Sequence, residues 1–233
     1  MRRPFLTARW SNVCLLTYEV PDAWLGPHLP PGCELDRRGG MALASLVAFD
    51  FLDTRVWGAA WPGYRCFAEM NLRFYVRRDG RRGVVFIREI VPGRLVAWLA
   101  RLIYNEPYVR APLTSATDES ADRIRVTHSL DWRGRRFRVG VEACKPSYTP
   151  EPDSFEHFLK EHQWGFGRAR DGRAVRYEVT HPVWDAYSVE AHDLDFDWEA
   201  VYGRPWGELS AQEPCSVILA AGSEVAVYPR EIP

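Results

Sequence analysis

Four polar side chains recur at strand spacing in two consecutive segments. Glu69, Asn71 and Arg73 occupy alternate positions of the first segment, and Arg88 lies in the second. Since successive side chains of a strand point to opposite faces, the first three share one face. A carboxylate, an amide and guanidinium groups on one face suit the binding of a small polar ligand and the transfer of a proton to or from it.

The register between the two segments depends on the turn that joins them. An Asp-Gly pair at 79–80 is typical of a two-residue hairpin loop. A hairpin closed there pairs Asn71 with Arg88 and places all four polar side chains on one face. A solvated hairpin face explains the same residues equally well, and a slip of one residue would scatter the cluster.

The opposite face of this hairpin is apolar, which predicts that it packs in a core. Its members are Met70, Leu72, Phe74, Val76, Val85 and Ile87.

A second polar group follows an apolar helical segment at 95–102. Its members are Tyr104, Asn105, Glu106 and Tyr108. They put an amide, a carboxylate and two phenols on an irregular segment that we expect near Glu69. Helix termination, with Asn105 as the cap and a proline after Glu106, accounts for the same residues without a function.

Size and charge limit the classes of function. The chain has 233 residues, 46% of them hydrophobic, and a net charge of −1. It can bury a sizeable core, and its charge argues against general nucleic-acid binding. No apolar run follows Met1, and the most hydrophobic stretch, 95–104, is too short to cross a bilayer. We therefore predict no membrane partner.

Cysteine and histidine usage predicts neither a disulfide framework nor a metal site. The five cysteines are widely spaced without a CxxC pair, which favours reduced thiols and a cytoplasmic location. His157 and His162 lie five apart, which does not match a zinc pair on a helix. The acidic run 192–197 lacks the glycine and the final glutamate of a calcium loop. No cofactor is predicted.

The remaining pattern predicts many antiparallel strands and three short helices. Segments 9–20 and 41–52 are predicted strands, and the second is apolar enough for burial on both faces. Helices are expected at 22–29, at 95–102 and from Asp153, as N-cap, to about residue 164. These elements indicate one mainly β (α+β) domain over residues 1–233.

Several blocks resemble a known family. They are LTARWSNVCLLTYEVP, LPPGCELD, LVAFDFLDTRVWG, MNLRFYVRRDGRRGVVFIREIVP, ARLIYNEPY, EHQWGF and HPVW. Together they resemble the uncharacterised YqjF-like family of bacterial proteins over nearly the whole chain. That family is distantly similar to the acetoacetate decarboxylase superfamily, which implies an antiparallel cone-shaped β-barrel around a buried pocket.

The resemblance also implies site residues. The superfamily's N-terminal arginine falls on Arg9 and its strand glutamate on Glu69. Its Schiff-base lysine falls on Glu106 or Tyr108, depending on the alignment, and neither has an amine. The two lysines, Lys145 and Lys160, do not substitute by position. Imine formation requires an amine, so decarboxylation by the superfamily's mechanism is not expected.

The sequence therefore predicts a pocket for a small organic acid or carbonyl compound. If the protein is an enzyme, it is a lyase, hydratase or isomerase with Glu69 or Glu106 as the acid–base group. The expected ligand-binding residues are Arg9, Asn71, Arg73, Arg88, Tyr104, Asn105 and Tyr108. A non-catalytic sensor and a structural protein are the alternatives, and a homo-oligomer is compatible with each.

Overall fold

The computed structural model describes residues 2–61, 63–93 and 107–232. Seven of the described strands form a closed barrel, in the order β14, β11, β10, β5, β4, β3 and β1. The ring closes because β14 pairs with β11 on one side and with Leu6–Arg9 of β1 on the other. The bounds of the barrel strands are β1 (Leu6–Glu19), β3 (Leu43–Val56), β4 (Phe67–Arg78), β5 (Arg81–Val91), β10 (Trp164–Arg168), β11 (Ala174–Thr180) and β14 (Glu224–Val227).

The predicted mainly β barrel is confirmed, with one correction. Most neighbouring strands are antiparallel, but β10 pairs with β5 in parallel, so the barrel is mixed. A short strand, β6 (Tyr108–Arg110), also pairs with β5 in parallel. β2 (Glu34–Leu35) pairs with β4.

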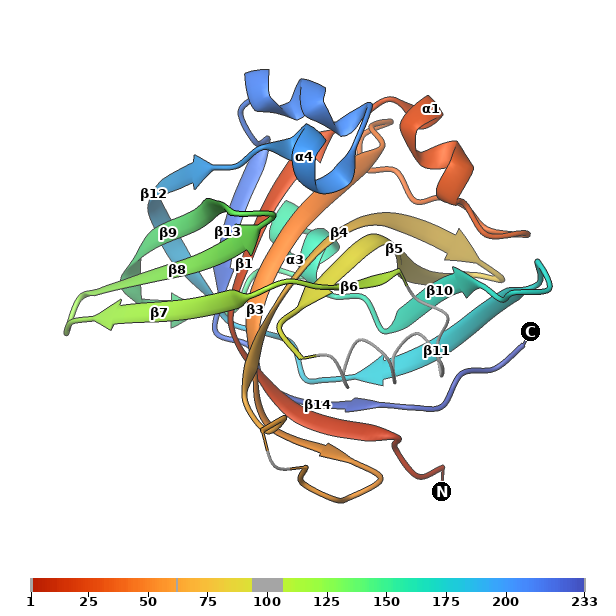
Figure 1. The fold of residues 1–233 in the computed structure, drawn as a ribbon, viewed down its shortest axis with the longest axis horizontal. Helices are drawn as coiled ribbons and strands as arrows, with labels where there is room; N and C mark the ends of the chain where they lie inside the picture. The colour runs from red at the N-terminus through yellow and green to blue at the C-terminus, as the bar shows by residue number, and fades with distance from the viewer. Residues whose placement is uncertain (1, 62, 94–106, 233) are drawn as a thin grey trace.

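A second set of strands, here called the outer wing, extends from β1. The C-terminal half of β1, Val13–Thr17, pairs with β13, and the sheet continues through β12, β9 and β8 to β7. Figure 1 shows this wing on the left, with β7 in light green at its edge. Its strands are β13 (Ser216–Ala220), β12 (Ala186–Asp195), β9 (Arg135–Tyr148), β8 (Arg123–Trp132) and β7 (Leu113–Glu119).

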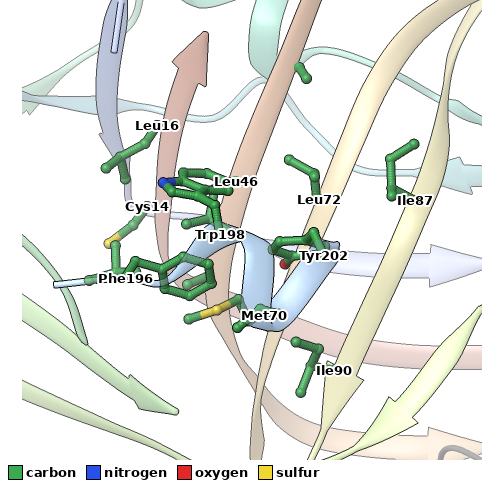
Figure 2. Close-up of a cluster of buried hydrophobic side chains, with 14 of the residues drawn as sticks. Cys14, Leu16, Leu46, Met70, Leu72, Ile87, Ile90, Phe196, Trp198 and Tyr202 are labelled. Atoms are coloured by element: carbon green, nitrogen blue, oxygen red, sulfur yellow. The ribbon is translucent and has the colours of Figure 1, made fainter. Parts of the chain in front are cut away.

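The main core fills the space between the outer face of the barrel and the wing. In Figure 2, Leu46, Met70 and Leu72 of the barrel strands pack against Trp198 and Tyr202 of α4. The predicted apolar face of the hairpin is confirmed, since all six of its residues are buried in this core. β3 is buried on both faces, as predicted, because one face packs in this core and the other lines the barrel.

Short helices cover the barrel and the wing. The described residues contain α1 (Asp22–Leu25), α3 (Phe155–Lys160) and α4 (Trp198–Tyr202), with the 3-10 helices η1 (Gly26–His28) and η2 (Trp206–Ala211). No helix in the described part of the chain has the length and hydropathy needed to cross a membrane. The predicted helix at 95–102 lies outside the described residues.

The predicted helix after Asp153 is shorter than expected. Its N-cap is Ser154, whose Oγ accepts the backbone N–H of His157 at 3.1 Å, and it ends at Lys160. The residues expected at its C-terminus form β10 instead. A Cβ on Gly165 would lie 2.2 Å from the ring of Tyr177, its partner on β11, so this glycine leaves room for that ring over β10.

A β-bulge changes the polar face of the hairpin. Arg78 pairs with Arg81 as predicted, but the register shifts by one between Arg73 and Leu72. Ile87 is the extra residue of β5, so Asn71 lies opposite Glu89. The predicted pairing of Asn71 with Arg88 is therefore wrong, because a bulge adds one residue to one strand only.

The bulge also reverses the direction of Arg88. Its guanidinium lies over the rings of Trp132 and Tyr202, at 5.8 Å from each centroid, on the outer face of the barrel. Glu89 takes its expected place on the inner face.

Candidate functional site

The barrel encloses a cavity of about 150 Å³. Each of the seven barrel strands contributes to its lining. Much of the wall is aromatic, with contributions from Trp10, Phe49, Phe51, Phe67, Phe86 and Trp184. An apolar cavity of roughly 150 Å³ holds a molecule of the size of benzene. The cavity therefore suits a small ligand with an apolar body.

The first polar group in the wall centres on Glu69, which is 3% exposed. Its Oε1 accepts a hydrogen bond from Nδ2 of Asn71 at 3.1 Å, and its Oε2 accepts one from the Tyr108 hydroxyl at 3.4 Å. Burial raises the pKa of Glu69 to about 7, while the two hydrogen bonds act in the opposite direction. A carboxyl group that titrates near neutrality suits acid–base chemistry.

Tyr108 connects Glu69 to a second buried carboxyl group. β6 places Tyr108 opposite Glu89, which is also buried and also lines the cavity. Burial, followed by the charges of Glu69 and Glu89, raises the pKa of Tyr108 well above its ordinary value. The phenol therefore stays protonated at neutral pH and acts as a hydrogen-bond donor.

The second polar group in the wall centres on Lys160, the last residue of α3. Its side chain is fully buried, and its Nζ lies 2.5 Å from Oε1 of Glu161. The same oxygen accepts the backbone N–H of Trp184 at 3.2 Å. His181 lies beyond, with Nδ1 at 3.9 Å from Oε2 of Glu161. The lysine and the glutamate form a paired, charge-balanced unit.

Arg73 and His162 lie in the same cavity wall. Arg73 donates to the backbone oxygen of Leu159 at 3.1 Å, which ties β4 to α3. The ring of His162 lies beside the ring of Tyr75, with 4.9 Å between centroids and an angle of 39° between the ring planes. Burial, then the charges of Arg73 and Arg82, hold the pKa of His162 well below its ordinary value, so its imidazole is neutral.

The structure brings four of the nine predicted site residues to this cavity: Glu69, Asn71, Arg73 and Tyr108. Arg88 lies on the opposite face of the sheet because of the bulge. Arg9 is exposed and does not line the cavity, because its strand neighbours Ala8 and Trp10 are the residues turned inward. Tyr104, Asn105 and Glu106 lie outside the described residues.

Sequence reasoning missed Glu89, Lys160, His162 and His181. The prediction excludes Lys160 because it lies on a helix, away from the position of the superfamily's Schiff-base lysine. A signal was nevertheless present, since His162 belongs to the block EHQWGF and His181 to HPVW. The other lysine, Lys145, lies on the outer wing and pairs with Glu119.

Among the residues that the structure describes, no cluster of histidine, cysteine, aspartate and glutamate side chains is arranged to hold a metal ion.

Comparisons with known proteins support the resemblance. A family model described as an uncharacterized conserved protein, DUF2071, matches residues 7–224. The uncharacterized protein YqjF of Bacillus subtilis (strain 168) is 27% identical over 184 residues, which cover 78% of this chain and 75% of that protein.

Solved structures support the fold. Acetoacetate decarboxylase from Legionella pneumophila matches with a TM-score of 0.67 at 16% identity, over 98% of this chain and 86% of that one. The enduracididine biosynthesis enzyme MppR, complexed with pyruvate, matches with a TM-score of 0.67 at 18% identity, over 100% of this chain and 91% of that one. The acetoacetate-decarboxylase-like fold is thus confirmed.

Proposed function

Because the chain belongs to the DUF2071 family and has an acetoacetate-decarboxylase-like fold, we propose that its barrel binds a small organic acid or carbonyl compound. We propose further that Glu69 transfers a proton on this ligand. One observation carries the proposal: a carboxyl group with a pKa of about 7 lies buried in the wall of the barrel cavity. Strongly shifted pKa values occur preferentially at functional sites.

The chemistry follows from the state of each group. Ionised Glu69 accepts a proton from the carbon next to the ligand's carbonyl, and the electrons of the broken C–H bond form an enolate. If a C=C bond is conjugated with the enolate, return of the proton to the far carbon of that system isomerises the ligand. If the carbon next to the deprotonated one carries a leaving group, its departure with the enolate electrons makes the reaction an elimination. Asn71 and Tyr108 hold the carboxyl group in place by hydrogen bonds to its two oxygens. These reactions correspond to an isomerase or a lyase.

Two further points support this assignment. The structural relative MppR, which has a similar fold, is complexed with pyruvate, a small keto acid. In one of the two alignments that the resemblance allows, the superfamily's Schiff-base lysine falls on Tyr108, and a phenol forms no imine. A decarboxylase that uses a lysine at this position is therefore not proposed.

Lys160 favours a second candidate function. Its amine lines the cavity from a different element, and a primary amine condenses with a carbonyl carbon to give an imine and one water molecule. The ion pair with Glu161 opposes this step, because it stabilises the protonated amine. Borohydride treatment in the presence of pyruvate distinguishes the two: a stable mass increase on Lys160 supports imine chemistry, and an unmodified chain supports proton transfer by Glu69.

The proposed proton transfer is tested by hydrogen–deuterium exchange at carbon. Pyruvate and 2-oxobutyrate are incubated with the protein in D₂O, and proton loss next to the carbonyl is followed by NMR. We expect exchange with the unchanged protein and with the control Glu213→Gln, whose side chain is exposed. We expect none with Glu69→Gln, which retains binding.

The alternatives have different outcomes in the same experiment. Binding without exchange in the unchanged protein supports a sensor and removes Glu69 from catalysis. Absence of binding to these and other small acids supports a structural role.

A further inference from the structure

We infer that Arg73 and His162 form a subsite for one carboxylate group, so that the ligand is a monocarboxylic acid with an apolar body. The inference rests on the proposed function, because it places the ligand in the same cavity. Beyond that function, it specifies that the ligand carries one carboxylate group and that Arg73 and His162 bind this group.

The first argument is the charge of Arg73. This side chain is 9% exposed and carries a permanent positive charge. In the part of the chain that the structure describes, no carboxylate lies within ion-pair distance of it, and its Nε has no hydrogen-bond partner. A buried charge without a counter-ion is costly, and an anionic ligand removes that cost.

The second argument is the environment of His162. It is 8% exposed, and neither ring nitrogen has a hydrogen-bond partner among the described residues. Buried polar groups are ordinarily paired, so two unpaired nitrogens in a cavity wall indicate a missing partner. The neutral ring has one N–H, which is able to donate to a carboxylate oxygen beside Arg73.

The charge balance selects a monoanion. Lys160 pairs with Glu161, and the nearby Arg82 shares the carboxylate of Asp36 with Arg77, each at 2.6 Å. With His162 neutral, Arg73 is, among the described residues that line the cavity, the arginine or lysine without a carboxylate partner. One carboxylate matches it, whereas a phosphate monoester brings a second negative charge.

The position of Glu69 is compatible with an anion at Arg73. The two residues are four apart on β4 and point to the same side, so their Cα atoms are separated by roughly 13 Å at about 3.3 Å per residue. An anion at Arg73 therefore lies away from the Glu69 carboxyl group. Aromatic side chains line much of the cavity that both residues face, which predicts an apolar or aromatic ligand body.

The test compares phenylacetate with its neutral analogue phenylacetamide by isothermal titration calorimetry. We expect the unchanged protein to bind phenylacetate more tightly. Arg73→Gln should weaken phenylacetate binding about 10- to 100-fold and leave phenylacetamide binding unchanged, because a charge-assisted hydrogen bond is lost. Arg73→Lys should retain an intermediate affinity. The control Arg55→Gln, at an exposed position of β3, should have no effect.

A second variant tests the subsite independently, in case Arg73→Gln does not fold. His162→Phe removes both ring nitrogens and keeps a ring beside Tyr75, and we expect a loss of roughly 3- to 10-fold for phenylacetate alone. Equal losses for both ligands in both variants indicate a structural role and overturn the subsite.

The proposed function and the subsite fail in different ways. If the unchanged protein binds phenylacetamide as tightly as phenylacetate, the carboxylate subsite is wrong and the cavity remains a ligand site. If it binds neither ligand, nor the keto acids tested above, both proposals are overturned.

Discussion

The hydroxyl of Tyr108 donates a hydrogen bond to Oε2 of Glu69 across 3.4 Å, although 39 positions separate the two residues in sequence. The parallel pairing of β6 with β5 brings them together. The ionisation of Glu69 therefore depends on a donor from outside its own hairpin.

Tyr108→Phe is predicted to raise the pKa of Glu69 above about 7. The hydroxyl stabilises the ionised carboxylate, so its removal favours the protonated form by up to about one pH unit. The midpoint of the pH–rate profile for carbon exchange should move to higher pH. Tyr148→Phe, at an exposed position of β9, serves as the control. An unchanged or lower midpoint would contradict the role assigned to this hydrogen bond.

Glu69→Gln is predicted to change how stability depends on pH. The pKa of Glu69 is raised from 4.5 to about 7 by folding, so its stabilising contribution is present below pH 4.5 and is lost as the pH rises through about 7. The shift corresponds to about 3 kcal/mol. Urea unfolding at pH 4.5 and pH 8 should show a smaller decrease for Glu69→Gln than for the unchanged protein. Parallel pH dependences would show that Glu69 titrates normally.

Lys160→Met is predicted to destabilise the protein by about 3–5 kcal/mol, because it leaves Glu161 without its buried counter-ion. The double variant Lys160→Met/Glu161→Gln should recover part of this loss, since glutamine still accepts the N–H of Trp184. Lys145→Met is the matched control, because its ion pair with Glu119 is more exposed and is worth at most about 1 kcal/mol. Equal free energies of unfolding for Lys160→Met and Lys145→Met would show that the buried ion pair stabilises the protein no more than the exposed one.

Gly83→Ala is predicted to weaken the junction of β5 with β10. An added Cβ would lie 2.4 Å from the backbone oxygen of Trp164, which has no rotamer by which to move away. We expect a loss of about 1–3 kcal/mol in unfolding free energy and weaker ligand binding. Gly26→Ala has open space and a helical φ of −50°, so it should be neutral or slightly stabilising. Similar effects of the two variants would contradict the close packing at Gly83.

The alternation of polar and apolar residues along the chain was sufficient to predict several barrel strands and the inward face of β4. Glu69, Asn71 and Arg73 point together because β4 itself is regular. The same reasoning failed at Arg88 on the neighbouring strand. A bulge has no clear signature in the sequence, yet each residue of the strand that follows it points to the face opposite to the one that alternation predicts.

The position of Lys160 could not be predicted from the sequence for a different reason. Its place in the cavity depends on where α3 ends and on how that end meets β4 through the bond from Arg73 to Leu159. Such a contact between distant segments has no local pattern. The blocks around His162 and His181 carried the resemblance, but a resemblance to an uncharacterised family assigns them no role.

β1 belongs to two structures at once. Its first half closes the barrel against β14, and its second half begins the outer wing against β13, while β3 pairs along most of its length. Among the described strands, β1 thus joins the barrel that contains the cavity directly to the outer wing. Removal of the wing would leave one edge of Val13–Thr17 unpaired, so we expect a substitution that detaches the wing also to destabilise the barrel around the cavity.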